Sequence, residues 1–272
     1  MSDSMRLHRA LARAGVASRR KAEQLIAEGR VRVNGERAHI GQVVDLGTDR
    51  VTLDGRSIAI AASPAVWLVL HKPAGVMTTR SDPGGRRTVF DFVEDVPGLV
   101  YVGRLDFDTE GVLLLTTDGE AAHRLTHPSG GVEREYRATV TGDAPGAVSR
   151  ARQGVRLHDG LVTPTRVEAS PAGGARAPRS GRGAGGAPGR TEARWYFDVV
   201  ITEGKKREVR RLCRALGLRV ERLVRVRFGP VRLGRLAAGQ VRPLRPAERA
   251  ALEALVAAGA RASAGDATRR QS

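Results

Sequence analysis

"GRLDFDTEGVLLLT", residues 103–116, places three acidic residues at alternate positions directly before a run of four apolar residues. The apolar run, residues 112–115, is typical of a strand buried in a core. We therefore expect the acidic segment to form a turn at the edge of a sheet, just before that strand. The acidic residues are Asp106, Asp108 and Glu110.

Three interpretations of this acidic turn compete. A calcium loop would begin at Asp106, but Thr117 stands where its closing bidentate Glu belongs, and the apolar run fills the positions between. A catalytic carboxylate would be held rigidly by the buried strand that follows it. Alternatively, the Asp only caps the turn by accepting hydrogen bonds from backbone N–H groups. The spacing disfavours calcium and, taken alone, favours the cap over catalysis.

The charge of the chain points to a polyanionic partner. Among 272 residues, 46 Lys and Arg stand against 29 Asp and Glu, which gives a net charge of +17. Nucleic acid is the commonest polyanion that such an imbalance serves. The abundance of Ala, Gly and Arg also fits a GC-rich coding bias, so composition alone leaves both explanations open.

The sequence contains no signal for export or membrane insertion. Cys213 is the only cysteine, which excludes an intrachain disulfide and a cysteine-based zinc cluster. Residues 1–20 lack the apolar core of a signal peptide. The longest apolar stretch, residues 58–70, is interrupted by Ser63 and Pro64 and is too short to cross a bilayer. We expect a soluble cytoplasmic protein that does not contact membranes.

Residues 5–60 carry the signals of a compact unit. Apolar residues at one-face spacing predict a first helix that Gly15 ends, and Ser18 is a suitable N-cap for a second helix. Asn-Gly and Asp-Gly dipeptides then predict tight hairpin turns at 34–35 and 54–55.

Basic residues crowd the two predicted helices and the turn between them. A solvated charged face is one explanation, but so many cations with few acids favour contact with phosphate groups. These residues are Arg6, Arg9, Arg13, Arg19, Arg20, Lys21, Arg30 and Arg32.

A second domain is predicted over residues 66–245, after a short linker at 61–65. Its strands outnumber its helices and adjoin each other in sequence, which favours an α+β fold on a largely antiparallel, mixed sheet. Cys213 belongs to the apolar stripe of a helix and is expected in the core. The predicted strands cover 99–102, 112–116, 136–141, 195–201 and 220–228, and the helices about 120–125 and 206–216.

Two segments are predicted to be disordered. Residues 171–190 consist only of Gly, Ala, Arg, Pro and Ser, and such a segment cannot bury enough apolar surface to become ordered. We expect it to be an insertion between two strands. A short helix is predicted over 246–257, followed by a disordered tail at 258–272.

Four segments resemble, in order and spacing, the RsuA/RluB family of ribosomal RNA pseudouridine synthases. "VGRLDFDTEGVLLLTTDGEAAHRLTHPS" resembles the family signature, and "LHKPAGVMTTRSDPGGRRTVFD" its KPxG motif. "EREYRATVTG" and "EGKKREVRRLCRALGLRVERLVRVRFGP" resemble the later motifs. Residues 6–60 resemble a small S4 (αL-type) RNA-binding domain. The variants "TTDGE…HPS", "SDPGGRRTVFD" and "GKKREVRRL" within these segments are closer to the large-subunit (RluB-like) branch.

The resemblance implies three catalytic residues in this chain. Members of the family break the N1–C1′ bond of a uridine and join C5 to C1′, without a cofactor. Asp106 matches the essential Asp, which must be ionised either to attack the sugar or base or to abstract a sugar proton. Arg210 matches the cation expected to keep that carboxylate charged. Tyr136 matches the Tyr that stacks on the uracil and assists deprotonation at C5.

The resemblance also implies residues that bind the RNA. The target base must leave its stack, and Arg104 matches the position from which a side chain fills the vacated space. Lys72 is included as a substrate-side residue that shapes the pocket wall beneath Tyr136. His71 receives no chemical role. The remaining candidates for RNA contact are Arg6, Arg19, Arg20, Lys21, Lys205, Arg207 and Arg211.

The sequence thus predicts an isomerase that forms pseudouridine in ribosomal RNA. Large-subunit (23S) rRNA, as a precursor or assembly intermediate, is the expected partner, and the protein is expected to act as a monomer. Two alternatives stay open: a synthase that acts on small-subunit (16S) rRNA, and a non-catalytic S4-type ribosome-assembly factor.

Overall fold

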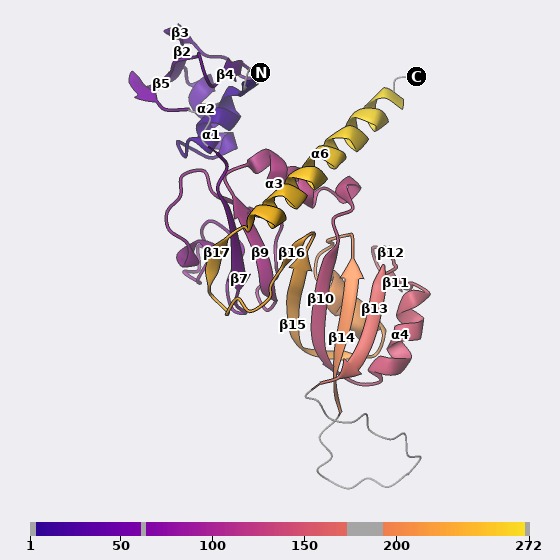
Figure 1. Cartoon of the computed structure of the whole chain (residues 1–272). Helices are drawn as coiled ribbons and strands as arrows, with labels where there is room; N and C mark the ends of the chain where they lie inside the picture. The colour runs from indigo at the N-terminus through magenta and orange to yellow at the C-terminus, as the bar shows by residue number, and fades with distance from the viewer. Residues whose placement is uncertain (1–3, 61–63, 173–192, 270–272) are drawn as a thin grey trace, which may run out of the picture.

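The computed structural model describes residues 4–60, 64–172 and 193–269. Figure 1 shows a small N-terminal part, a larger part built on a long twisted sheet, and a C-terminal helix that projects beyond the sheet. The larger part is an α+β fold on a mixed sheet that is antiparallel at all but one strand pair, which confirms the predicted fold class.

The N-terminal part contains the two predicted helices and short strand pairs. Ser18 caps the second helix by accepting a hydrogen bond from the Lys21 N–H at 3.3 Å. Asn34 and Gly35 both have positive φ, 53° and 88°, as a tight hairpin turn requires. The elements are β1 (Ser4–Arg6), α1 (Leu7–Arg13), α2 (Arg19–Ala27), β2 (Val31–Val33), β3 (Glu36–Arg37), β4 (Val43–Asp45), β5 (Val51–Leu53) and β6 (Arg56–Ile58).

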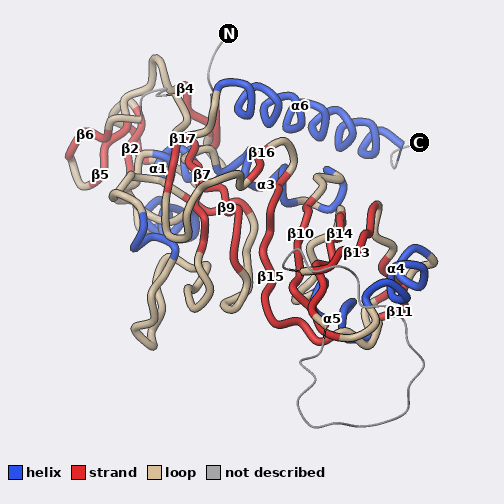
Figure 2. The backbone as a smooth tube through the Cα atoms, turned by 60° about the horizontal axis from the view of Figure 1, so that its bottom comes forward, coloured by secondary structure: helices blue, strands red, loops and turns tan. Residues whose placement is uncertain are grey.

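A nine-stranded sheet forms the centre of the larger part, with the order β13-β14-β10-β15-β9-β7-β17 and with β8 and β16 paired beside it. Figure 2 shows these strands from another side, with α4 and α5 next to them. The strands are β7 (Trp67–Lys72), β8 (Val100–Val102), β9 (Glu110–Thr116), β10 (Arg134–Thr141), β13 (Arg166–Pro171), β14 (Arg194–Ile201), β15 (Arg219–Phe228), β16 (Val231–Arg232) and β17 (Val241–Pro243). The other elements are a hairpin of β11 (Val155–Leu157) and β12 (Gly160–Val162), and the helices α3 (Gly119–Thr126), α4 (Ala144–Arg152), α5 (Glu208–Ala215) and α6 (Pro246–Arg269).

Strand β9 joins the two halves of this sheet and is buried on both faces. Leu113 and Leu115 pack in one core cluster and Val112 and Leu114 in another, which explains the uninterrupted apolar run. Gly111 lies where β9 runs parallel to β15. A Cβ atom at Gly111 would lie 2.2 Å from the Arg225 carbonyl oxygen, so only glycine allows this close approach.

The N-terminal part packs against the larger part through the end of α1. Arg9 forms an ion pair with Glu120 of α3 at 2.8 Å. Backbones also meet closely, because a Cβ atom at Gly98 would lie 2.4 Å from the Arg13 carbonyl oxygen. The position of α1 beside the larger part can be followed in Figure 1.

The C-terminal helix differs from the prediction. Helix α6 continues to Arg269, whereas the sequence predicted a helix that ends at 257 and a disordered tail after it. Alanine is frequent in this stretch and has the highest helix propensity of all residues. Residues 270–272 lie outside the described residues, as does nearly all of the expected insertion at 171–190. Only Pro171, the end of β13, and Ala172 are described there. Among the described residues, no helix could cross a membrane.

Candidate active site

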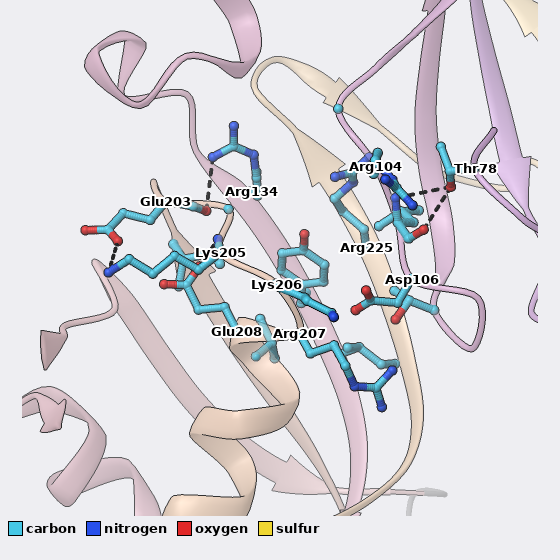
Figure 3. Close-up of a pocket in the computed structure, with 18 of the residues that line it drawn as sticks. Thr78, Arg104, Asp106, Arg134, Glu203, Lys205, Lys206, Arg207, Glu208 and Arg225 are labelled. Carbon is cyan, nitrogen blue, oxygen red and sulfur yellow. Dashed lines mark hydrogen bonds and ion pairs between the residues drawn. The ribbon is translucent and has the colours of Figure 1, made fainter. Parts of the chain in front are cut away.

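A cleft of about 1070 Å³ opens where the turn before β9 faces β10, β15 and the start of α5. Figure 3 shows Asp106 and Arg104 on one wall, with Lys206 and Arg207 on the other. Asp106 projects into the space between the walls. Other residues that line the cleft include Thr78, Phe107, Arg134, Tyr136, Lys205 and Arg225.

The turn that carries Asp106 is fixed by hydrogen bonds to its backbone. The Thr109 N–H donates to the Asp106 carbonyl at 3.0 Å and closes the turn. The Thr78 hydroxyl donates to the Leu105 carbonyl at 2.8 Å, on the other side of Asp106. The Asp106 side chain is thus half-buried on an immobilised backbone, the arrangement that a catalytic carboxylate needs.

Lys72 lies beneath this turn and is fully buried. Its Nζ donates to the carbonyls of Thr109 at 2.8 Å, Pro73 at 2.9 Å and Asp106 at 3.1 Å. Burial lowers the pKa of Lys72 to about 8, although the nearby carboxylates of Asp108 and Asp106 raise it. The inclusion of Lys72 among RNA-contacting residues is therefore wrong. It supports the turn below Asp106 rather than the wall beneath Tyr136.

Asp108 connects the turn to helix α5. Arg207 contacts both of its carboxylate oxygens at 3.1 Å. The Arg210 Nη2 donates to the Asp108 carbonyl at 2.8 Å, and the Arg210 Nε lies 3.3 Å from the Asp108 carboxylate. Burial acts to raise the pKa of Asp108, but Arg207 and Arg210 together lower it.

The structure departs here from the expected pairing of Arg210 with Asp106. Arg210 is held by Asp108, because the turn directs the Asp108 carboxylate and carbonyl toward α5. The charge of Asp106 acts to raise the pKa of Lys72 and the pKa of Arg207, so both of these cations lie near its carboxylate. Arg207 also has the left-handed backbone conformation, φ 51°, which is uncommon for a side chain of this kind.

Glu110, the third acid, also has an arginine partner. Its carboxylate accepts from Arg222 at 2.7 and 2.9 Å, and this hydrogen-bonded pairing lowers the pKa of Glu110. Within residues 4–60, 64–172 and 193–269, no group of three potential metal-binding side chains converges. Asp108 and Glu110 are therefore each held by arginines, whereas Asp106 lines the cleft.

Tyr136 occupies the wall of the cleft formed by β10. It is 8% exposed and pairs in register with Arg225 of β15 and Val199 of β14. Arg134, two residues earlier on the same strand face, also lines the cleft. The fold thus brings Tyr136 into the same cleft as Asp106, whereas Arg210 does not line it.

The other candidate residues lie in different surroundings. Arg104 is exposed at the cleft and adjoins the Asp106 turn. Lys205 lines the cleft but pairs with Glu203 at 2.6 Å. Arg211 does not line the cleft and pairs with Asp159 at 2.7 Å. In the N-terminal part, the exposed candidates are Arg6, Arg19, Arg20 and Lys21.

Several residues of the site were missed from the sequence. Nothing in the sequence indicates that the Thr78 hydroxyl donates a hydrogen bond to the Leu105 carbonyl. Arg134 could have been found, because residues at i and i+2 of a strand share a face with Tyr136. Arg225 and Glu208 are 2% and 4% exposed, and charged residues are expected at the surface when only the sequence is known.

Comparison with known families identifies the class of this fold and site. The model of the RNA pseudouridylate synthase family matches residues 66–215, and the S4 domain model matches residues 5–51. The chain therefore belongs to the RNA pseudouridylate synthase family and carries an N-terminal S4 domain.

Individual relatives agree with this assignment. The chain is 41% identical over 239 residues to a ribosomal large subunit pseudouridine synthase B of Haemophilus influenzae. This alignment covers 85% of this chain and 62% of the relative. It is 43% identical over 250 residues to an uncharacterized RNA pseudouridine synthase of Mycobacterium bovis. That alignment covers 90% of this chain and 91% of the relative. A crystal structure of a pseudouridylate synthase, 26% identical, superimposes with a TM-score of 0.58 over 91% of this chain and 99% of the other. The predicted similarity to the RluB-like branch is confirmed, although the chain spans only 40–62% of the length of the large-subunit relatives.

Proposed function

We propose that this protein converts a specific uridine of large-subunit ribosomal RNA to pseudouridine. The reaction breaks the N1–C1′ bond and forms a C5–C1′ bond, so no atom is lost and no oxidant or energy source is required. The observation that carries the proposal is the Asp106 carboxylate, which projects into a cleft shared with Tyr136 from a turn fixed by Lys72 and Thr78.

Asp106 supplies the reacting carboxylate in this proposal. Its carboxylate either attacks the sugar or the base or removes a sugar proton. Tyr136 contacts the uracil ring and assists proton removal from C5. Arg210 acts as a positioning residue through Asp108, because its contacts hold the turn and not the carboxylate of Asp106.

The uridine must leave its stack to reach Asp106. Arg104 adjoins the Asp106 turn and is exposed, so its side chain is available to fill the vacated space. The S4 domain adds exposed cations that contact phosphate groups outside the cleft. The net charge of +17 supports this division between a reacting site and a wider binding surface.

The test is a pseudouridine map of ribosomal RNA from a strain that lacks this gene. We expect one or more large-subunit positions to remain uridine, and expression of the wild-type chain to restore them. Expression of Asp106→Asn should leave them unmodified. Loss of a small-subunit position instead would move the substrate to 16S rRNA, and an unchanged map of both subunits would overturn the proposal. A cytoplasmic location follows from the substrate, and a monomeric state stays a prediction.

A further inference from the structure

Phe107 is an exposed aromatic residue directly after Asp106, and the proposed reaction gives it no role. Its side chain is 45% exposed and lines the cleft. Among the described residues, it is the only aromatic member of the exposed large apolar side chains. A ring of this size at a polar cleft offers an aromatic face that a ligand can contact.

The backbone of Phe107 is held firmly although its ring is exposed. Its carbonyl accepts from the Gly75 N–H at 2.8 Å and from the Lys72 Nζ at 3.4 Å. The Asp106 carbonyl, one residue earlier, closes the turn with the Thr109 N–H at 3.0 Å. The ring therefore projects from a fixed point, and a ligand that stacks on it loses little free energy to ordering of the backbone.

A fixed cation lies beside this ring. The Arg86 guanidinium carbon is 6.0 Å from the Phe107 ring centroid, near the outer limit of a cation–π contact. Arg86 is held by Asp82, which accepts from its Nη2 at 2.7 Å and its Nε at 3.0 Å. The guanidinium thus stays next to the ring while more than half of its side chain remains exposed, 55%.

The loop that carries Arg86 is also fixed to the body of the protein. Arg80 and Arg87 stack over Phe90 and Phe92, at 4.3 and 4.5 Å from their ring centroids. Arg80 donates to the Leu99 carbonyl at 3.0 Å. Both halves of the feature, the ring and its cation, are therefore held in place before any ligand arrives.

We propose that Phe107 and Arg86 form a stacking platform for an unpaired RNA base next to the target uridine. The ring receives the base face, and Arg86 contacts the phosphate of the same nucleotide. Aromatic rings bind unpaired bases by stacking, and arginine suits phosphate oxygens. The proposal rests on the proposed function, because the uridine at Asp106 places its neighbour within reach of the adjacent residue. Arg104 and Lys206 are exposed cations that line the same cleft, and they favour RNA over a protein partner with an apolar surface.

The experiment measures RNA affinity and rate separately for four variants. The probe is large-subunit rRNA from the strain that lacks the gene, so the target uridine is unmodified. Phe107→Ala should weaken binding by about fivefold to about a hundredfold, the range for one base stacked on an aromatic ring. Phe107→Tyr should bind within about twofold of wild type, and Phe107→Leu should resemble Phe107→Ala, because stacking needs an aromatic face. Arg86→Gln should weaken binding with little change in the salt slope, because Asp82 already pairs with the Arg86 charge.

The control is Leu161→Ala, which removes another exposed apolar side chain of the same domain, 55% exposed and outside the cleft lining. It should bind rRNA as wild type does. Single-turnover rates at saturating RNA should change far less than affinity in the Phe107 variants, which shows that Asp106 is still positioned.

Wild-type affinity in Phe107→Ala would overturn the platform, as would a Phe107→Leu variant that binds as well as Phe107→Tyr. These outcomes test the platform only if the wild-type protein forms pseudouridine in the rRNA probe. A wild-type protein that forms no pseudouridine in either rRNA would instead contradict the proposed function, so the two failures are distinguishable.

Discussion

Helices α2 and α5 both begin with clusters of basic residues, but the two clusters are used differently. On α2, Arg19, Arg20 and Lys21 are exposed, and none of them forms an ion pair with a described carboxylate. On α5, Arg210 and Arg211 are held by Asp108 and Asp159. The first cluster is available to an outside polyanion, whereas much of the second is already neutralised inside the protein.

This difference shows that the density of positive charge does not by itself identify an RNA-binding surface. The 205–227 segment is the more basic in sequence, yet its arginines largely position the turn, the sheet and the neighbouring hairpin. The α2 cluster has fewer cations but leaves them to the solvent. Removing cations from α5 should therefore lower the rate, and removing them from α2 should lower the affinity.

The largest effect is expected from the carboxylate that the α5 cluster helps to position. Asp106→Asn preserves size but removes the charge, so the rate of pseudouridine formation should fall by about a thousandfold or more. Binding of unmodified rRNA should change little. Single-turnover assays with purified protein measure the rate, and a rate near that of wild type would remove Asp106 from the mechanism.

A smaller effect is expected when the connection between α5 and the turn is broken. Arg210→Gln removes the contacts to Asp108, and a small displacement of the turn can reduce the rate by about a hundredfold. Asp108→Asn should show a loss in the same direction, and the two losses should not add in the double variant.

The matched control for this connection is Arg214→Gln, an exposed arginine in the last turn of α5. It should react as wild type does. If Arg210→Gln instead changed only the affinity for RNA, the positioning role would be refuted and α5 would resemble α2.

Removing the α2 cluster should affect affinity and its salt dependence. The triple variant Arg19→Gln, Arg20→Gln, Lys21→Gln should bind rRNA more weakly, and the slope of log affinity against log salt should become shallower by about 2 to 3. The rate at saturating RNA should be retained, because none of these residues lines the cleft.

A control triple removes the same charge from exposed arginines that already pair with acids: Arg137, Arg194 and Arg249. Its salt slope should stay close to that of wild type. Equal slopes for the two triples would mean that the pairing of cations does not distinguish the two clusters.

The sequence predicted the fold well where local signals and core patterns agree. The cap at Ser18, the Asn34-Gly35 turn and the buried run at 112–115 are set by neighbouring residues, and all three were predicted. The end of α6 was not predicted, because an alanine-rich helix and a disordered tail have similar amino-acid compositions.

The site was predictable as a set of residues but not as a set of contacts. Family motifs located Asp106 and Tyr136, and the fold brings both to one cleft. The pairing of Arg210 with Asp108, and the burial of Lys72 under four carbonyls, depend on how segments far apart in sequence meet. Motif spacing holds no information on which of two neighbouring acids faces a given arginine.

The smallest effect is expected at the joint between the two regions, the Arg9–Glu120 ion pair. Both side chains are about one-third exposed, 31% and 34%, and Glu120 also contacts Arg124 at 3.2 Å. A double-mutant cycle with Arg9→Gln and Glu120→Gln should give a coupling free energy below about 1 kcal/mol in urea unfolding. Gly98→Ala should destabilise the joint more, because its Cβ atom would lie 2.4 Å from the Arg13 carbonyl oxygen and Gly98 has a φ of +75°. A coupling well above this limit, with a neutral Gly98→Ala, would mean that charge rather than close backbone packing holds the S4 domain in place.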